Sequence, residues 1–352
     1  MQGTGNRLVA VDGLRGVAAI CVALMHAHIS ILPVLRGYLA VDFFFILSGY
    51  VIARSYEPRF AAGLGVGEYA WARIERLYPL LLIGSVTGVA AWLAGYSEFV
   101  PAGPADLVRA LIGQFAMIPF LSTASSLAFD AALWSISFEL LANIAHASIY
   151  PRLSTRRLPL LIAASFLLLA FMAHRYGSLN IGWNRASALG GLGRVMFGFF
   201  AGVLLWRTEA WWAPRTPRLP FALICLVLIA VVNAPLAGKG QGLWGTLYDL
   251  GIVALAMPML VMLGVRANGA GRFALGLGGL SFPVYAIHVP LVDAMRLAGW
   301  SNEVRIAGVA AVAAVAWLIG RHVDEPLNAW RRASRKRSAA RRTAAALRQT
   351  AG

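Results

Sequence analysis

Long apolar runs recur along nearly the whole chain, separated by short segments that carry most of the arginines. Each run is long enough for a helix to cross a hydrocarbon core of roughly 30 Å, which takes about 20 residues. The pattern predicts an all-α, polytopic membrane protein with about ten transmembrane helices in one bundle. The expected spans are 8–29, 39–54, 77–93, 131–150, 158–172, 189–206, 219–232, 248–265, 274–295 and 306–319.

One further apolar stretch, Leu107–Leu121, is ambiguous, and the charge of the loops decides it. Arginines gather after the second, fourth, sixth and eighth spans and in the C-terminal tail. Cytoplasmic loops carry an excess of Lys and Arg, and these loops share one face only if Leu107–Leu121 does not cross. We therefore expect both termini in the cytoplasm, with Leu107–Leu121 interfacial or re-entrant. The alternative of eleven spans would put the tail outside.

Composition supports one membrane domain rather than several soluble ones. Hydrophobic residues make up 59% of the chain and charged residues 13%, with a mean hydropathy of +0.69. Soluble domains carry about 25% charged residues. We expect a transmembrane domain over residues 1–326 and a basic cytoplasmic tail over 327–352, in a bacterial inner membrane. Cys21 and Cys225 lie in apolar runs, which indicates neither a disulfide framework nor a metal site.

The net charge of +16 is explained by the membrane without nucleic acid. From Arg321 onward the chain holds nine Lys or Arg, including the run Arg335-Lys336-Arg337. Basic segments beside a membrane contact anionic headgroups and fix topology. The expected partner of the tail is therefore the lipid bilayer.

Ionisable side chains inside the spans need a reason, because each costs roughly 2.5–3.5 kcal/mol at mid-helix on insertion scales. In the first span, Arg15 and His26 are eleven residues apart. At 100° per residue they fall within about 20° of one face, roughly 16 Å apart along the axis. One stripe thus presents a cation deep inside and an imidazole nearer the outer surface. Two interpretations of these residues are equally good. They form part of a site, or Arg15 snorkels to the inner headgroups and His26 lies at the outer interface.

Polar residues in three other spans favour a site. The second span opens with Asp42 and continues through Phe43-Phe44-Phe45 to Ser48; the fourth carries Trp134-Ser135-Ile136-Ser137-Phe138-Glu139; the ninth runs from Ser281 through Pro283 and Tyr285 to His288. The topology puts His26, Asp42, Trp134 and Glu139 in the outer half, and His288 about halfway across. Without His-x3-His spacing, the set does not indicate a metal.

The cytoplasmic loop before the third span adds Arg73, Arg76 and Tyr78. Guanidinium groups pair bidentately with phosphates, and aromatic rings can stack on a base. Taken by itself, the cluster fits ordinary positive-inside anchors with interfacial aromatics equally well.

Together these motifs resemble the acyltransferase-3 family of integral-membrane acyltransferases, which O-acylate lipopolysaccharide O-antigens, exopolysaccharides, nodulation oligosaccharides and some antibiotics. Ala40, Tyr50 and Leu140–Asn143 depart from the common pattern and leave the acceptor specificity open. The matching motifs occur in family order: Asp12-Gly13-Leu14-Arg15-Gly16 with His26; Val41-Asp42-Phe43-Phe44 through Ser48-Gly49-Tyr50; Arg73, Arg76 and Tyr78-Pro79; Trp134-Ser135 with Glu139; Arg194, Phe197 and Gly202; Ser281, Pro283, Tyr285 and His288; and Glu325-Pro326.

The resemblance implies a reaction between two substrates, with no permanently bound cofactor. Acyl-CoA, such as acetyl-CoA, would enter from the cytoplasm, and a carbohydrate or glycolipid hydroxyl would be O-acetylated. Arg73, Arg76 and Tyr78 would bind the CoA moiety. Arg15 would pair with the pantetheine-side phosphate or polarise the thioester. The extended pantetheine arm is of the same order of length as the Arg15–His26 separation.

Within that reaction, we expect His26 to act as general base on the acceptor hydroxyl, since a neutral imidazole suits that role near pH 7. Asp42 or Glu139 would orient it or hold the acceptor, and His288 is a second candidate base. A covalent acyl-His26 intermediate is the alternative route. The remaining assignments are substrate contacts by Ser48, Trp134, Ser137 and Tyr285, a channel wall at Phe43–Phe45, and structural roles for Arg194, Glu325 and Pro326.

Two other classes of function remain open from the sequence. In a transporter or export protein for a glycan or small molecule, the same buried charges would serve a proton or substrate pathway. Such a protein is expected to show inverted repeats with broken helices, and the sequence shows no such symmetry. In a structural partner of a glycan-assembly complex, the polar stripe would be dispensable.

Overall fold

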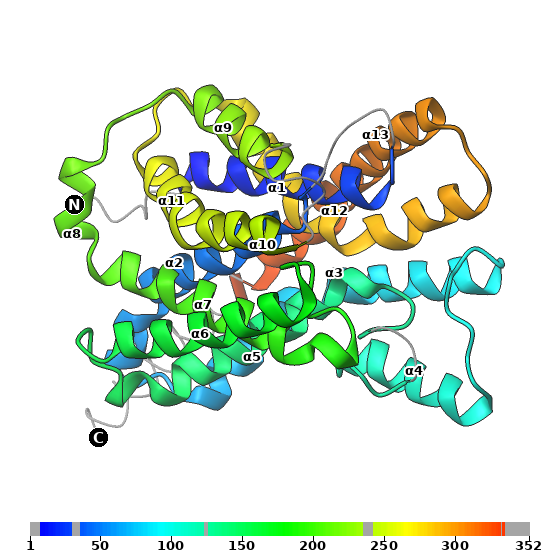
Figure 1. The fold of residues 1–352 in the computed structure, drawn as a ribbon, viewed down its shortest axis with the longest axis horizontal. Helices are drawn as coiled ribbons and strands as arrows, with labels where there is room; N and C mark the ends of the chain where they lie inside the picture. The colour runs from blue at the N-terminus through cyan, green and yellow to red at the C-terminus, as the bar shows by residue number, and fades with distance from the viewer. Residues whose placement is uncertain (1–7, 30–35, 123–125, 235–241, 332, 335–352) are drawn as a thin grey trace, which may run out of the picture.

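The computed structural model describes residues 8–29, 36–122, 126–234, 242–331 and 333–334, which fold into an all-helical bundle (Figure 1). Eight helices within these residues are long and apolar enough to cross a membrane, so the expected all-α, multi-pass fold is confirmed. They are α1 (Val9–His26), α2 (Leu39–Ala61), α3 (Val66–Leu93), α6 (Leu158–Tyr176), α7 (Ala188–Arg207), α10–α11 (Gly242–Arg266, through a π-helical turn at Ile252–Ala256), α12 (Arg272–Leu297) and α13 (Asn302–Ile319, continuing to Arg331).

The other two expected spans are occupied by shorter helices. These are α5 (Trp134–Ile149) and α9 (Phe221–Asn233). Short turns at Ala131–Leu133, Tyr150–Arg152, Arg185–Ser187 and Ala213–Arg215, with α8 (Glu209–Trp212), connect the longer elements. The run Arg335-Lys336-Arg337, and with it most of the expected basic tail, lies outside the described residues.

The ambiguous apolar stretch forms α4 (Pro104–Ala116), a helix of 13 residues. At 1.5 Å per residue it is about 20 Å long, which is shorter than a hydrocarbon core of roughly 30 Å. It lies against α3, where Gln114 Nε2 donates to Ser85 Oγ at 3.1 Å. The Gln114 side-chain oxygen accepts the backbone N–H groups of Phe129 and Asp130, so the chain turns back towards α3. We call α4 and this returning segment the re-entrant hairpin, after the expected alternative whose shape it has.

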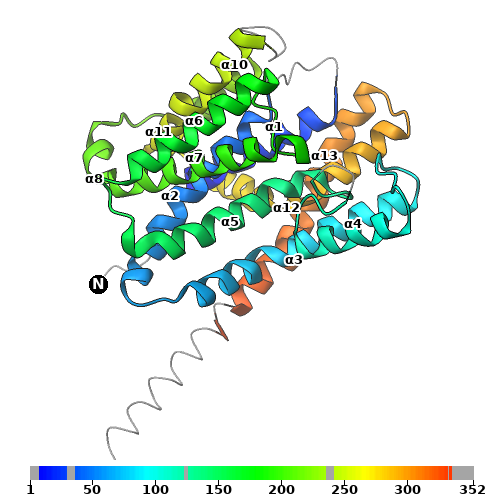
Figure 2. The same cartoon turned by 60° about the horizontal axis from the view of Figure 1, so that its bottom comes forward.

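Successive long helices run in alternating directions, which places the start of α1 and the end of α13 at the same end of the bundle (Figures 1 and 2). We call this end the arginine end, because α3 begins there and carries Arg73 and Arg76 in its first half. The opposite end, where α1 stops and α2 begins, is the far end. There Arg305, near the start of α13, donates to the Ala27 carbonyl at 2.7 Å.

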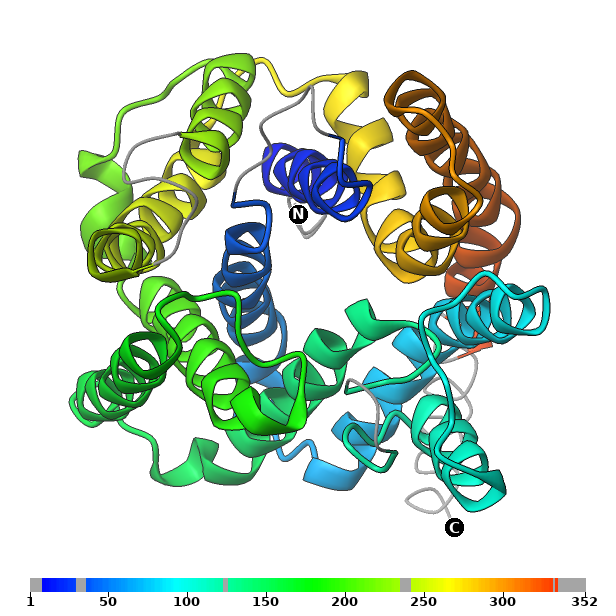
Figure 3. The same cartoon turned by 45° about the vertical axis from the view of Figure 1, so that its right-hand side comes forward.

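Glycines let α1 approach α12 closely. A Cβ at Gly16 would overlap the Leu277 backbone carbonyl, and one at Gly278 would lie 2.7 Å from the Asp12 Cβ. Small residues at such positions allow close helix packing in membranes, where no hydrophobic force draws helices together. The glycines around Arg15 therefore bring this arginine beside α12, and Figure 3 shows the two helices side by side.

Helix α2 runs through the middle of the bundle against α7 (Figure 3). A Cβ at Gly49 would overlap the Phe199 carbonyl oxygen, so these backbones also touch. A buried ion pair joins the same helices: Arg194 donates through Nη2 and Nε to both Asp42 carboxylate oxygens, at 2.7 and 3.1 Å. A second buried pair, Arg36 with Asp249 at 3.0 Å, joins the turn before α2 to α10.

Candidate functional site

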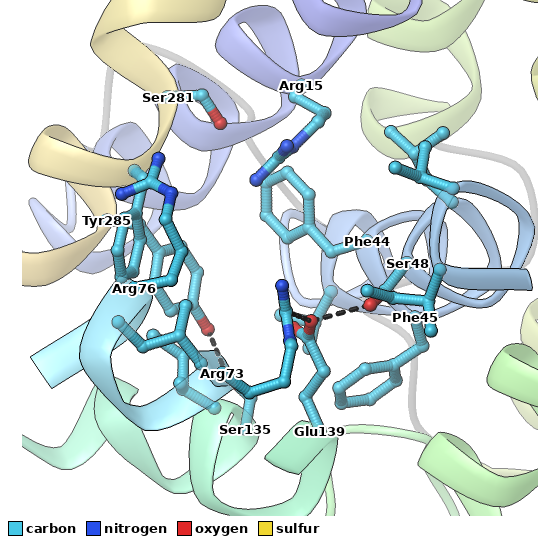
Figure 4. Close-up of a pocket in the computed structure, with 17 residues that line it drawn as sticks. Arg15, Phe44, Phe45, Ser48, Arg73, Arg76, Ser135, Glu139, Ser281 and Tyr285 are labelled. Atoms are coloured by element: carbon cyan, nitrogen blue, oxygen red, sulfur yellow. Dashed lines mark hydrogen bonds and ion pairs between the residues drawn. The ribbon is translucent and has the colours of Figure 1, made fainter. Parts of the chain in front are cut away.

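A cavity of about 140 Å³ opens between α1, α2, α3, α5 and α12 (Figure 4). Its apolar wall comes mainly from α2 and includes Phe44 and Phe45. Its polar lining comes from all five helices. The polar side chains are Arg15, Ser48, Arg73, Arg76, Ser135, Glu139, Ser281 and Tyr285.

Three guanidinium groups face this cavity, as Figure 4 shows. Arg76 is fully paired, because its two terminal nitrogens donate to the Asp324 carboxylate at 2.6 and 3.2 Å. Arg73 lies 3.6 Å from the Glu139 carboxylate. Across the described parts of the chain, no carboxylate forms an ion pair with Arg15. Asp12 and Glu139 attract Arg15 electrostatically, but its guanidinium makes no direct ion pair with them.

Helix α3 extends the predicted third span towards the arginine end. The sequence placed Arg73 and Arg76 in a loop, but both lie within the continuous helix Val66–Leu93. One turn before Arg73, the buried Tyr69 donates its hydroxyl to Asn143 Oδ1 at 2.6 Å, and Asn143 Nδ2 donates to the Glu139 carbonyl at 2.7 Å. These bonds tie the start of α3 to α5 and hold the Arg73–Glu139 pair in place.

The position of Glu139 differs from the sequence-based expectation. We expected it at the depth of His26, in the outer half of the membrane. It instead shares the cavity with Arg73 and accepts a hydrogen bond from Ser48 Oγ at 2.6 Å. The reason is that α5 begins at Trp134, after the re-entrant hairpin, and its first turns lie beside the arginines rather than at the far end.

A chain of side-chain contacts leads from the cavity towards the far end. Tyr285 shares a 2.6 Å hydrogen bond with Ser135, and both line the cavity. The Tyr285 ring lies 5.5 Å, centroid to centroid, from the ring of His288. The His288 ring in turn lies 5.2 Å from that of His26. The structure thus brings both expected histidines together, beyond the inner wall of the cavity.

The surroundings of His288 assign its tautomer. Its Nδ1 lies 2.9 Å from the Tyr285 carbonyl oxygen and 3.2 Å from that of Val284. Carbonyl oxygens only accept, so Nδ1 carries the proton and Nε2 of the neutral ring keeps its lone pair. Nε2 is buried and has no hydrogen-bond partner among the described residues. It is therefore free to accept a hydrogen bond.

Besides the two histidines, four residues expected at the site lie outside the cavity lining. Both Asp42 oxygens accept from Arg194, and Trp134 packs its ring 5.5 Å from the Arg194 guanidinium. Ser137 donates to the Leu133 carbonyl at 3.3 Å within its own helix. Tyr78 donates to the Phe115 carbonyl at 3.1 Å and so holds α4 rather than facing the arginines.

Asp324 and Asn143 were missed as partners of the site. Asp324 lies in a π-helical turn, Gly320–Asp324, at the end of α13, and π-helical turns are frequent at functional sites. Its neighbour Glu325 was part of the family motif, but 248 positions separate it from Arg76, so no spacing rule could pair them. Asn143 lies one turn after Glu139 on α5, and that spacing was a usable signal.

Comparison with known proteins assigns the family. A family model described as an acyltransferase domain, Acyl_transf_3, matches residues 8–321. "Protein 2 in picA locus" of Rhizobium radiobacter is 31% identical over 190 residues, covering 50% of this chain and 99% of that protein. A Komagataeibacter xylinus protein provisionally named membrane-bound transacylase BcsY is 28% identical over 328 residues, covering 81% of this chain and 73% of that one. No solved structure matches. The chain belongs to the acyltransferase-3 family and is a multi-pass membrane acyltransferase.

Proposed function

We propose that this protein moves an acetyl group from acetyl-CoA to a hydroxyl of a carbohydrate acceptor in the bacterial envelope. The donor enters at the arginine end, and the acceptor reacts near the histidine pair. The arginine end faces the cytoplasm of the inner membrane, because it carries the arginine-rich loops together with both ends of the described chain.

The cavity suits the narrow part of the donor. Its 140 Å³ lies below the roughly 300–1,000 Å³ typical of small-ligand pockets, so it takes the pantetheine arm while the nucleotide stays at the mouth. The Arg76 side chain is 38% exposed and marks that mouth, whereas that of Arg73 is 14% exposed. Guanidinium groups bind phosphate through charge-assisted hydrogen bonds. Arg15, whose guanidinium makes no direct ion pair among the described residues, draws a phosphate inward or polarises the thioester carbonyl.

The histidine pair supplies the proton chemistry. His26 takes the proton from the acceptor hydroxyl while its oxygen attacks the thioester carbonyl. The carbon–sulfur bond breaks, and the CoA thiolate recovers a proton from the imidazolium, so that the protein returns to its starting state. His288 packs its neutral ring against His26 and holds that imidazole at the place where the acceptor hydroxyl reacts.

Glu139 then belongs to the donor side. Its contacts with Arg73 and Ser48 support a role in holding that guanidinium in the cavity rather than in orienting His26. Ser48 and Tyr285 line the passage of the acyl group. Asp42, tied to Arg194 through both oxygens, supports the bundle.

One observation carries this proposal. A helix that holds an unpaired arginine in a cation-rich cavity also carries, eleven residues later, a histidine packed against a second histidine. Arg15 and His26 therefore lie roughly 16 Å apart on one helix. This arrangement joins an anion-binding pocket to a proton acceptor over the reach of the pantetheine arm.

The test uses the full chain in lipid nanodiscs with labelled acetyl-CoA and isolated envelope glycan. We expect His26→Ala to abolish transfer of label to glycan and to leave CoA binding intact. His174→Ala, at an exposed histidine near the end of α6, is the matched control and should transfer normally. Unchanged transfer by His26→Ala would contradict the role of His26. Wild-type protein that transfers no label to any envelope glycan would contradict the proposed function itself.

A further inference from the structure

A second cavity, of about 340 Å³, lies at the far end of the bundle. It is enclosed by the last turns of α3, the segment that follows α3, residues 128–131 and the outer half of α12. Its mouth is exposed, with Tyr96 at 42% of its surface and the Glu98 side chain at 67%. Its floor is buried, with Phe99 at 7% and Phe129 at 4%. The pocket therefore opens away from the arginine end.

The floor of this cavity is fixed by bonds that need no ligand. The side chain of Gln114 holds the backbone N–H groups at Phe129 and Asp130, at 3.1 and 3.3 Å. The ring of Phe129 packs edge-on against Phe99, with centroids 5.3 Å apart, and against Trp92 at 5.7 Å. Binding sites for small molecules are usually preformed in this way, with aromatic walls and a few placed polar groups. The re-entrant hairpin thus forms part of the floor of the pocket.

The polar groups at the mouth are mainly acceptors. Arg296 Nη2 donates to Glu98 Oε1 at 2.6 Å and to Asp293 Oδ1 at 3.2 Å. One guanidinium is thus shared by two carboxylates, and these carboxylates line the cavity whereas Arg296 does not. Ionised carboxylates have about four acceptor positions each, so both retain positions for hydroxyl donors. Anionic groups entering the mouth would meet like charge at short range.

Helix α12 joins this pocket to the reaction centre. We call the cavity beside Arg15 and Arg73 the donor cavity and the second one the far-end cavity. Tyr285 lines the donor cavity, while Val289, Pro290 and Asp293 line the far-end cavity. His288 lies between these two sets on the same helix, and its ring contacts that of His26. Residues 285 and 289 are one turn apart, about 6 Å along the axis. His288 directly precedes Val289, so the far-end cavity borders the turn of α12 that carries this histidine.

We propose that the far-end cavity binds the acceptor, and that it selects an uncharged, polyhydroxylated unit such as a neutral sugar residue of a glycan. This inference rests on the proposed function, because it assigns the acceptor of that same reaction. Glu98 and Asp293 accept the sugar hydroxyls, the Tyr96 ring covers the apolar face of the sugar, and Phe99 and Phe129 form the floor. Acidic sugars are disfavoured because the mouth is already negative.

Chemical protection at the mouth tests binding directly and does not depend on catalysis. Ser97 lines the cavity, so Ser97→Cys introduces a thiol that a small maleimide can label. The wild-type chain reports background labelling of Cys21 and Cys225. The probes are uncharged glucose-, galactose- and mannose-based oligosaccharides and matched uronic-acid oligosaccharides. We expect at least one uncharged set to slow labelling severalfold, with little effect of the uronic acids or of acetyl-CoA. No protection by any oligosaccharide, or stronger protection by uronic acids, would overturn the proposal.

Two carboxamide variants add a kinetic arm. Glu98→Gln and Asp293→Asn should each raise the acceptor KM about tenfold, since each weakens a charge-assisted hydrogen bond to a sugar hydroxyl. CoA affinity should not change. Glu303→Gln, at an exposed carboxylate on α13 at the same end, is the matched control. The wild-type chain could be protected by neutral sugars and yet neither bind CoA nor transfer acyl groups. That result would contradict the proposed function and support the sugar pocket. Normal acetyl transfer without protection of the thiol by any sugar would contradict the pocket assignment alone.

Discussion

The imidazole rings of His26 and His288 lie 5.2 Å apart, centroid to centroid, and are tilted by 59°. His26 is the last residue of α1, and His288 lies in the outer half of α12. Helices α1 and α12 pack against each other, and the two rings meet where α1 ends. The pair lies between the donor cavity and the far-end cavity, so we treat the two rings as one proton-handling unit.

If the two rings act as a unit, their replacement should not be additive. We expect His288→Gln to lower the acyl-transfer rate by about 10²–10⁴-fold, the usual contribution of general acid–base catalysis. The double variant with His26→Ala should be scarcely slower than the slower single variant. The measurement is the rate of label transfer at saturating acetyl-CoA. A double variant whose loss equals the product of the two single losses would show that the histidines act separately.

The donor cavity makes a prediction about charge. Arg73→Gln should weaken CoA binding about tenfold or more, because it removes a charge-assisted hydrogen bond to phosphate. Glu139→Gln should have a smaller effect, and that effect should disappear in the Arg73→Gln background, since the carboxylate acts through the guanidinium 3.6 Å away. Equilibrium binding of labelled CoA gives all four values. Arg175→Gln, at an exposed arginine near the end of α6, is the control; an equal loss there would point to a general surface effect.

The Arg194–Asp42 pair is expected to govern stability. Arg194→Met leaves a buried carboxylate unpaired, which typically costs about 3–5 kcal/mol, whereas the double variant with Asp42→Leu should recover much of that loss. Thermal unfolding in detergent of the single and the double variant measures the difference in their stability. CoA affinity per folded molecule should stay at the wild-type level. An Asp42→Asn variant with unchanged melting and no acyl transfer would instead assign Asp42 to catalysis.

Two glycines provide a matched test of the packing. A Cβ at Gly49 would overlap the Phe199 carbonyl oxygen of the neighbouring helix, whereas one at Gly276 on α12 meets no atom within 4 Å. Gly49→Ala should therefore force α2 and α7 apart and lower the yield and melting temperature of folded protein. Gly276→Ala should be neutral or stabilising by up to about 1 kcal/mol, from helix propensity. Equal melting temperatures for the two variants would contradict the close α2–α7 contact.

The sequence by itself determined the features that lie within one helix. Run length predicted the spans, because crossing a hydrocarbon core is a local requirement of each segment. The spacing of Arg15 and His26 placed both on one stripe, because they share a helix with a fixed rise and turn. The ordered motifs indicated the family, which the match over residues 8–321 confirms.

The tertiary structure decided every relationship between helices. Glu139 lies beside Arg73 and not at the depth of His26. Arg76 pairs with Asp324, and Asp42 pairs with Arg194. Each of these pairs depends on how far one helix is shifted and rotated against another. That shift is determined by backbone contacts at glycines and by the position in the bundle at which the hairpin leaves the start of α5. No periodicity in the chain records such a shift, because it is a property of two surfaces in contact.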